Sequence, residues 1–351
     1  MTDTTRPNPK PSTPSTPSPK GQSPAKPRAS ATPQTADRRG LTQVADAIQA
    51  VTDNVERVLV GKEEQARLAV VCLFAEGHLL LEDKPGTGKT SLARAIAASI
   101  GGRARRIQFT PDLLPSDVTG VSVFKPDTRT FEYRKGPVFA NVVIADEINR
   151  ASPKTQAALL EVMAERRVSA DGSTFEVPRP FMVVATQNPI DFQGTYPLPE
   201  VQLDRFAMRL HIGYADAEAE FKILTARDAS DPVAALDSVV PADRLSKMIG
   251  AIQQMQLKPE LIRYVVDIAA ASRSHDDLRL GVSTRATLTL LAVLRAHAVG
   301  QGRSWVDPDD VKYLAEPVLA HRMLVTPAAE LDGVTSADVL AEILDKVAVP
   351  R

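Results

Sequence analysis

The stretch that decides the fold is residues 78–90, which read His78-Leu79-Leu80-Leu81-Glu82-Asp83-Lys84-Pro85-Gly86-Thr87-Gly88-Lys89-Thr90. It opens with an apolar run typical of a buried strand, passes through a glycine-rich turn and leads into residues 91–100, whose spacing predicts a helix. A glycine-rich loop between a strand and a helix is the setting in which phosphate groups are bound. These residues therefore predict a nucleotide-binding α/β fold.

The turn contains the residue types that bind a triphosphate. Backbone N–H groups at a helix N-terminus bind phosphate oxygens, and Gly86 and Gly88 let the backbone approach them without a Cβ in the way. Lys89 would supply positive charge to the β- and γ-phosphates, and the Thr90 hydroxyl would complete a Mg²⁺ shell made mostly of water and phosphate oxygens. We therefore assign ATP and Mg²⁺ as ligands, and these nucleotide-binding residues: Pro85, Gly86, Thr87, Gly88, Lys89, Thr90 and Ser91.

One residue departs from the pattern G-x-x-x-x-G-K-[ST]. Asp83 stands where that pattern has its first glycine. A carboxylate beside phosphates repels them unless its side chain points away. The geometry at the start of the loop is therefore an open question.

Polar side chains follow two further predicted strands. The apolar run 142–145 ends in Asp146 and Glu147, and the run 181–186 leads to Asn188. Carboxyl ends of parallel strands face a shared ligand crevice. We assign Asp146 to Mg²⁺ through its water shell, and Glu147 as the base that orients and deprotonates the attacking water, which points to hydrolysis. Asn188 is the candidate polar sensor of the water or the γ-phosphate, with a plain turn-forming Asn-Pro as the alternative.

The order of apolar patterns predicts a parallel sheet between helices. Five segments are typical of buried strands: 78–82, 106–109, 142–145, 181–186 and 206–212. Two hairpins interrupt the alternation, 121–124 with 130–133, and 167–170 with 173–177 around the favoured turn Asp171-Gly172. Beyond residues 228–241 the strand signals stop, and helical spacing over 257–271, 283–299 and 308–320 predicts a small all-helical domain.

Composition divides the chain into three parts. Residues 1–40 are dominated by Pro, Ser, Thr and Lys and predict a disordered tail. We assign residues 41–232 to the nucleotide-binding domain and 233–351 to the helical domain. The tail carries seven Lys and Arg against two Asp, which leaves 35 against 41 acidic residues in the remainder. This mildly acidic body argues against a broad nucleic-acid-binding face.

Composition also restricts where in the cell the protein is expected and which metals it is expected to bind. The chain has no apolar run long enough to cross a bilayer and no apolar signal stretch at its start, so we expect a cytoplasmic protein without membrane insertion. Cys72, the single cysteine, lies in an apolar run and is predicted to be a core residue. The five histidines are scattered, so no metal other than Mg²⁺ is predicted.

Two arginines are candidates for a catalytic role. Either Arg205 or Arg285 could neutralise the charge that develops during phosphoryl transfer, as an arginine finger does. Spacing alone does not choose between them. An ordinary surface salt bridge is the alternative for each.

Four stretches beyond the loop resemble the MoxR family of the AAA+ superfamily. They are Gln108-Phe109-Thr110-Pro111-Asp112-Leu113-Leu114-Pro115-Ser116-Asp117, Ala145-Asp146-Glu147-Ile148-Asn149-Arg150-Ala151, Ala185-Thr186-Gln187-Asn188-Pro189 and Pro199-Glu200-Val201-Gln202-Leu203-Asp204-Arg205-Phe206. The resemblance covers about residues 41–345, and the tail lies outside it.

The resemblance implies a ring, commonly hexameric, in which Arg205 reaches into the neighbouring subunit's site. It implies that Arg285 contacts the γ-phosphate of its own subunit and that Gly61 lies in the adenine-side loop. The two hairpins would line the pore or face a client. Members of the family are chaperone-like ATPases that typically act with a von Willebrand factor A domain protein.

We therefore predict a ring-forming ATPase that remodels, matures or assembles protein partners, with hydrolysis shifting the helical lid against the sheet domain. One alternative is an ATP-gated scaffold or switch with little turnover, because Asp83 would compromise the loop. Another is a DNA-remodelling AAA+ motor, since helicase-like members share the first hairpin insert. The client, the ring size and the purpose of the tail are not encoded in any motif.

Overall fold

The computed structural model describes residues 1–2, 38–84, 86–188, 195–225 and 231–350. Pro85 and nearly all of the predicted tail lie outside the described residues. Helix α1 (Arg38–Glu56) begins slightly before the predicted start of the ordered chain at residue 41. Residues 35–351 form one compact unit. Among the described helices, none is both long and apolar enough to cross a membrane.

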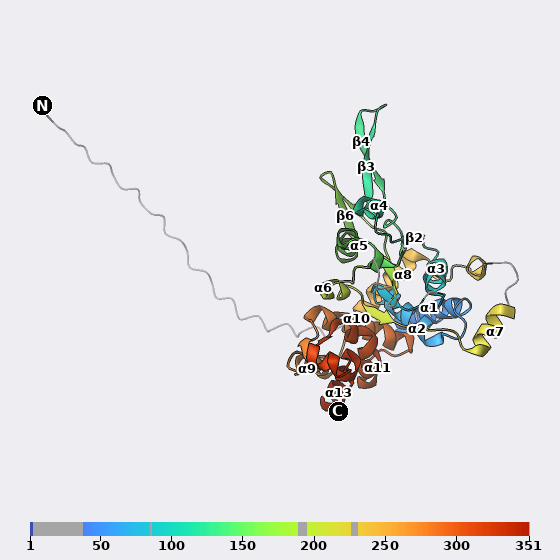
Figure 1. Ribbon diagram of the computed structural model, residues 1–351, viewed down its shortest axis with the longest axis vertical. Coiled ribbons are helices and arrows are strands. Elements are labelled where there is room, and N and C mark those ends of the chain that lie inside the picture. Colours follow the sequence, from blue (N-terminus) through green and yellow to red (C-terminus); the bar gives the residue numbers. More distant parts are fainter. Residues whose placement is uncertain (3–37, 85, 189–194, 226–230, 351) are drawn as a thin grey trace, which may run out of the picture. The chain divides into compact units, whose positions relative to one another are not determined.

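A five-stranded parallel sheet lies at the centre of this unit (Figure 1). Its strands are β1 (Leu79–Glu82), β2 (Ala104–Gln108), β5 (Val142–Asp146), β8 (Met182–Gln187) and β9 (Met208–Leu210), in the order β2-β5-β8-β1-β9. Every pairing is parallel. The five strands predicted from the apolar runs are confirmed, with ends shifted by a few residues.

Both faces of the sheet are buried, because successive side chains of a strand point to opposite faces. In β1, Leu79 and Leu81 join the apolar cluster formed with α1, α2 (Glu63–Phe74) and α3 (Lys89–Ser99). Leu80 joins the cluster on the other face, with α4 (Pro115–Thr119) and α5 (Pro153–Glu165). Cys72 is fully buried in the first cluster, as predicted.

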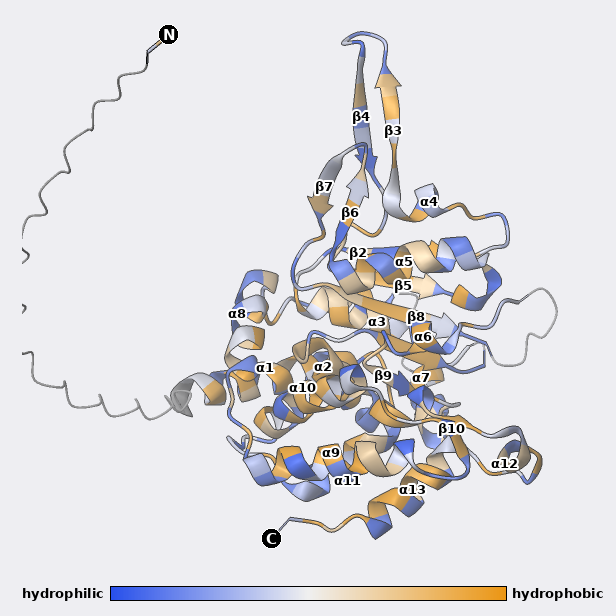
Figure 2. Cartoon of the chain, turned by 90° about the vertical axis from the view of Figure 1, so that its left-hand side faces the viewer, coloured by the Kyte–Doolittle hydropathy of each residue, from blue (hydrophilic) through white to orange (hydrophobic). Residues whose placement is uncertain are grey.

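Both predicted hairpins are present and extend away from the sheet beyond α5 (Figure 2). The first pairs β3 (Gly120–Lys125) with β4 (Thr130–Lys135), and the second pairs β6 (Arg167–Ala170) with β7 (Ser173–Glu176). Phe124 and Phe131 are exposed and face each other across the first hairpin, with ring centroids 5.4 Å apart. Short elements α6 (Glu200–Leu203) and α7 (Ala217–Thr225) flank strand β9.

The C-terminal region is helical, as predicted, with one addition. Its helices are α8 (Ala242–Gln253), α9 (Pro259–Arg273), α10 (Thr284–Gly300), α11 (Pro308–Leu319), α12 (Pro327–Leu331) and α13 (Ser336–Lys346). Strands β10 (Leu278–Leu280) and β11 (Leu324–Val325) form a short antiparallel pair that the expectation of an all-helical region missed. These strands are too short to show period-2 alternation, which explains the omission.

The helical region, called the lid below, shares one apolar core with α1, α2 and α3. Leu290 and Val293 of α10 belong to the same buried cluster as Val51 of α1 and Leu73 of α2. The lid therefore packs on the sheet domain through continuous buried apolar surface.

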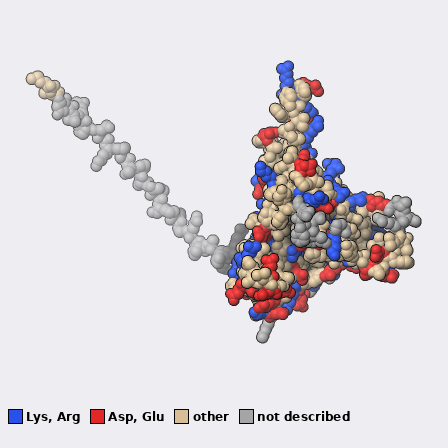
Figure 3. All heavy atoms as spheres, viewed as in Figure 1, with Lys and Arg blue, Asp and Glu red and all other residues tan. Residues whose placement is uncertain are grey.

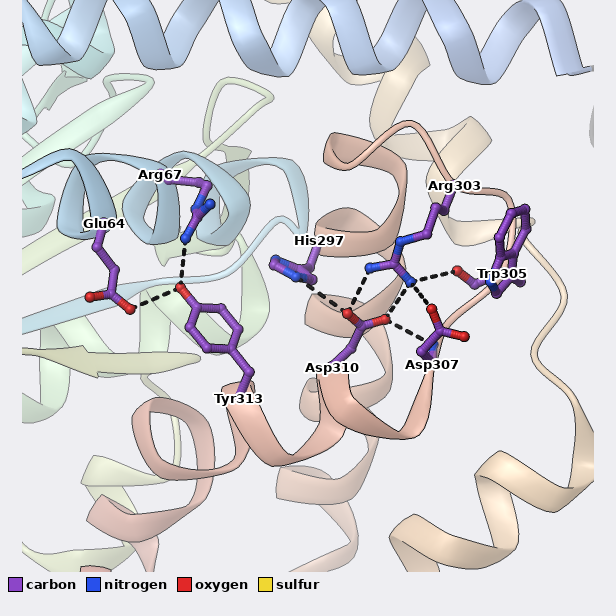
Figure 4. A network of polar contacts seen from close by, with 8 residues as sticks. All are labelled: Glu64, Arg67, His297, Arg303, Trp305, Asp307, Asp310 and Tyr313. Carbon is purple, nitrogen blue, oxygen red and sulfur yellow. Dashed lines mark hydrogen bonds and ion pairs between the residues drawn. The ribbon is translucent and has the colours of Figure 1, made fainter. Parts of the chain in front are cut away.

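A polar network adds to this packing (Figure 4). Tyr313 of α11 donates a hydrogen bond to Glu64 of α2 at 3.1 Å and accepts one from Arg67 of α2 at 3.1 Å. Asp310, one turn earlier, accepts two hydrogen bonds from the Arg303 guanidinium at 2.7 and 2.8 Å. The Tyr313 contacts therefore fix α11 against α2 of the sheet domain, whereas the Arg303 contacts hold the start of α11 within the lid.

Candidate nucleotide site

The phosphate loop joins β1 to α3, as the sequence predicts. Gly86 and Gly88 have φ angles of +86° and +87°, a left-handed conformation that glycine adopts without steric cost. Helix α3 begins at Lys89, so its free N–H groups face the loop. The Lys89 ammonium donates to the backbone carbonyls of Asp83 and Lys84. Burial lowers the pKa of Lys89, although nearby Asp83, Asp146 and Glu147 oppose this shift.

A cavity of about 820 Å³ opens beside the loop. Gly86, Thr87, Gly88 and Ser91 line one side of it, and residues 57–60 and Lys62 line another. Gly61 has φ +74°, and a Cβ there would come within 2.6 Å of Ala219 in α7. Glycine at this position therefore lets the segment 57–62 pack closely against α7, at the edge of a cavity large enough for a nucleotide.

Asp83 points away from the phosphate loop. Its carboxylate accepts hydrogen bonds from the N–H groups of Ile212 and Gly213, beyond the end of β9, and from its neighbour Lys84 at 2.8 Å. Burial alone would raise the pKa of Asp83, but these three N–H groups and the charge of Lys89 hold it below its usual value. The residue that replaces glycine therefore ties the start of the loop to the neighbouring strand.

We expect Asp83→Asn to lower the free energy of unfolding at neutral pH by about 1–3 kcal/mol, the usual contribution of hydrogen bonds to a charged acceptor. Because the folded pKa lies below the unfolded value of 3.8, the contribution of the carboxylate is present above that value and lost as pH falls through the folded pKa. Urea unfolding of both proteins over a pH series measures the difference. Glu218→Gln, on the exposed face of α7, is the control. A difference that grows toward acid pH would contradict this role.

Asp146 lies at the end of β5 beside the phosphate loop. Its side chain is buried, and its Oδ2 lies 3.4 Å from the Thr90 hydroxyl. Its Oδ1 accepts a hydrogen bond from Thr186 of β8 at 3.3 Å. A carboxylate and a hydroxyl oxygen that converge beside a phosphate loop fit Mg²⁺, which prefers oxygen ligands and keeps several waters. Arg106 of β2 also pairs with Asp146, so a cation already contacts this carboxylate.

Glu147 follows Asp146 in a left-handed backbone conformation with φ +55°. Such a conformation is uncommon for a residue with a Cβ and often marks a functional position. Its Oε2 accepts hydrogen bonds from Gln108 of β2 at 3.1 Å and from Arg150 at 3.0 Å. The acid is thus held by two side chains that the sequence-based assignment did not include.

Asn188 follows β8, which lies between β5 and β1 in the sheet. Glu82 and Gln187 are in register, so Asn188 emerges beside Asp83 at the carboxyl end of the sheet. Its carbonyl accepts a hydrogen bond from Asn149 at 3.4 Å. The structure therefore brings Asn188, Asp146, Glu147 and the phosphate loop to adjacent strand ends.

The two candidate catalytic arginines lie away from the phosphate loop. Arg205 and Arg285 line a second cavity of about 360 Å³, together with Gly77, His78 and Arg166. Gly77 and His78 precede β1, whereas the phosphate loop follows it, and the two cavities share no lining residue. Arg205 donates from Nη1 to the Leu160 carbonyl of α5. The contact of Arg285 with its own subunit's γ-phosphate, which the resemblance implied, is not supported by this position at the opposite end of the sheet.

The residues that sequence reasoning missed surround the acids. Arg106 and Gln108 are two apart on β2, and Gln108 pairs in register with Asp146. The period of two along a strand places both on one face, which is a usable signal once β2 is known to neighbour β5. Strand order, however, is not evident from spacing along the chain.

Comparison with known proteins identifies the family. Residues 78–208 match the model of the ATPase family associated with various cellular activities (AAA), and residues 270–343 match that of the AAA lid domain. Chaperone MoxR1 of Mycobacterium tuberculosis is 37% identical over 321 residues, which cover 89% of this chain and 85% of that protein. The chain belongs to the MoxR family of AAA+ ATPases.

Two further relatives agree with this membership of the MoxR family. The uncharacterized protein YeaC of Bacillus subtilis is 46% identical over 298 residues, 85% of this chain and 93% of that protein. A crystal structure of a predicted ATPase from Cytophaga hutchinsonii superposes with a TM-score of 0.82 at 34% identity, covering 89% of this chain and 98% of the other. The parallel sheet and helical lid are thus those of a MoxR-type AAA+ protein.

Proposed function

We propose that this MoxR-family protein hydrolyses ATP at sites formed between neighbouring copies in a ring. Gly86, Gly88 and Lys89 bind the phosphates, Thr90 and Asp146 hold Mg²⁺, which neutralises phosphate charge when bound, and Glu147 takes a proton from the attacking water. Asn188 hydrogen-bonds that water or the γ-phosphate. Pro85, Thr87 and Ser91 complete the phosphate loop. Gly61 belongs to the segment on the adenine side of the nucleotide.

One observation supports the shared site above all others. Arg205 and Arg285 lie in a cavity at the amino end of β1, and the phosphate loop lies at its carboxyl end. Either of these two guanidinium groups can therefore stabilise charge on a γ-phosphate only in the site of another copy. A head-to-tail contact of this kind closes into a ring when the rotation between copies allows it. We assign Arg205 to this role. We assign Arg285 to the same role in a neighbouring copy's site, in place of a contact with the nucleotide of its own subunit.

The process that ATP hydrolysis drives is inferred from membership of the MoxR family. We propose chaperone-like remodelling, maturation or assembly of protein partners by a cytoplasmic hexamer, with a von Willebrand factor A domain protein as partner. The relative named Chaperone MoxR1 supports the chaperone-like part. The exposed Phe124 and Phe131 pair on the first hairpin is suited to contact a client. The division of the chain near residues 40 and 232 is part of this proposal.

Mixing two inactive variants tests the shared site. Neither Glu147→Gln nor Arg205→Ala subunits should hydrolyse ATP alone. In mixed rings, an Arg205→Ala subunit retains Glu147 and receives Arg205 from its Glu147→Gln neighbour, so phosphate release should return in proportion to such junctions. Mixing Glu147→Gln subunits with the double variant is the control and should stay inactive. No recovery from the first mixture, in rings shown to exchange subunits, would refute the proposal.

A specific observation favours the scaffold alternative as second candidate. Arg106 pairs with Asp146, and Gln108 and Arg150 hold Glu147, so both acids are engaged by protein groups. A protein with little turnover would release phosphate slowly even with its partner present, and steady-state phosphate release with and without partner separates the two. A DNA-remodelling role gains no comparable support, since the face in Figure 3 shows Lys and Arg interspersed with Asp and Glu and no continuous basic surface.

A further inference from the structure

The segment that carries Arg205 is held by the lid. Ser283, the N-cap residue of α10, donates to the Asp204 carboxylate at 3.2 and 3.3 Å. On the other side of Arg205, the Phe206 carbonyl accepts two hydrogen bonds from the lid. One comes from His321 Nε2 at 3.1 Å and the other from Arg322 Nη2 at 2.6 Å. The lid therefore contacts the residue before Arg205 and the residue after it.

Arg322 is the residue that makes contacts on both sides. Besides its bond to the Phe206 carbonyl, its Nε lies 3.5 Å from Asp204 Oδ1. Its side chain is only 2% exposed. Burial lowers its pKa to about 10, and Asp204 opposes that shift. The guanidinium is thus charged at neutral pH, although almost no solvent reaches it.

Keeping this charge inside the protein has a cost. Within the described part of the chain, Nε and Nη1 of Arg322 have no hydrogen-bond partner, although Nε keeps the ion pair with Asp204. Buried donors without partners destabilise a fold, and an apolar side chain of similar length avoids that cost. Such departures from good packing gather at functional sites. The feature beside Arg322 that carries function is the segment 204–206.

We propose that Arg322 is a positioning residue that sets the backbone of residues 204–206, so that Arg205 projects toward the neighbouring subunit. The inference rests on the proposed function and adds to it the lid residue on which the finger depends. Arg322 holds a carboxylate on one side of Arg205 and a carbonyl on the other, which restricts both directions in which the segment could turn. Because its side chain is buried, Arg322 acts through this segment and not through a contact of its own with nucleotide.

Three variants of the full-length protein test this role. Arg322→Met should lower the kcat of ATP hydrolysis by about tenfold to a hundredfold, because small misplacement of a catalytic group has effects of that size. The Kd for ATP should stay unchanged, since the phosphate loop lies at the other end of β1. Arg322→Lys keeps the charge but lacks the planar fork of the guanidinium that reaches both acceptors, so it should recover part of the activity. The control is Arg279→Ala, which removes an exposed lid contact to Glu200 and should retain full activity.

Subunit mixing separates positioning from a general loss of structure. Arg322→Met subunits should regain activity with Glu147→Gln subunits, which donate a correctly held Arg205, but not with Arg205→Ala subunits, because neither then donates a working finger. Activity in the latter mixture, or none in the former, would overturn the inference. If Arg322→Met does not fold, Arg322→Lys undergoes the same mixing, and its partial activity should rise with Glu147→Gln subunits but not with Arg205→Ala subunits. Failure of the Glu147→Gln and Arg205→Ala mixture would instead refute the proposed function itself.

Discussion

Replacing Glu147 with glutamine is expected to lower the kcat of ATP hydrolysis by about 10²–10⁴-fold, the range supplied by general base catalysis. Glutamine keeps the shape and the hydrogen bonds to Gln108 and Arg150 but cannot accept a proton from water. ATP affinity should be unchanged, because Lys89 and the loop glycines are untouched. Phosphate release and equilibrium binding of a fluorescent ATP analogue measure the two quantities.

The matched control is Glu161→Gln, an exposed residue on the outer face of α5. It makes the same chemical change away from the strand ends and should retain wild-type kcat. If Glu147→Gln bound ATP and still turned it over at the wild-type rate, another group would have to be the base.

Replacing Arg205 with alanine should lower kcat by about 10³–10⁵-fold, the contribution of arginine fingers to phosphoryl transfer. The guanidinium stabilises charge that develops on the γ-phosphate in the transition state, so kcat falls while the Kd for ATP stays the same. On the proposed function, the interaction lost in this variant is one between subunits. Activity of the wild type should therefore rise more than linearly with protein concentration where rings assemble, and that of the variant should stay low throughout.

Arg167→Ala is the control for this second prediction. Arg167 is an exposed arginine that follows α5 and pairs with Glu165 on the surface. Its removal should change kcat little, because exposed ion pairs contribute little. Retained turnover in Arg205→Ala rings of normal size would show that the cavity holding Arg205 is not completed by a neighbour's nucleotide.

Local signals explain why much of this fold could be predicted from the sequence. The apolar runs ending at Glu82, Asp146 and Gln187 are buried on both faces and bounded by polar residues, so their strands were evident without knowledge of their neighbours. The turn Asp171-Gly172 likewise sets its hairpin from two residues. The phosphate loop is recognisable for the same reason, since its strand, glycines and helix are contiguous.

What could not be predicted depends on contacts between distant residues. Asp83 looked like a defect in the loop, because its partners at Ile212 and Gly213 are far along the chain. Gln108 reaches Glu147 only because β2 neighbours β5 in the sheet. Arg285 lies in the first turn of α10, where its spacing predicts it, but the site it can reach depends on the end of the sheet against which the lid packs.

The apolar core shared by the lid and helices α1 to α3 bears on how such a motor moves. Swinging the lid away would expose that core, and each 100 Å² of apolar surface brought into water costs about 2.5 kcal/mol, a large part of the roughly 5–15 kcal/mol by which a typical domain is stable. In the proposed ring, we therefore expect most of this core to stay buried throughout the cycle. The lid would then move against the sheet domain only by shifts that leave the shared apolar surface covered.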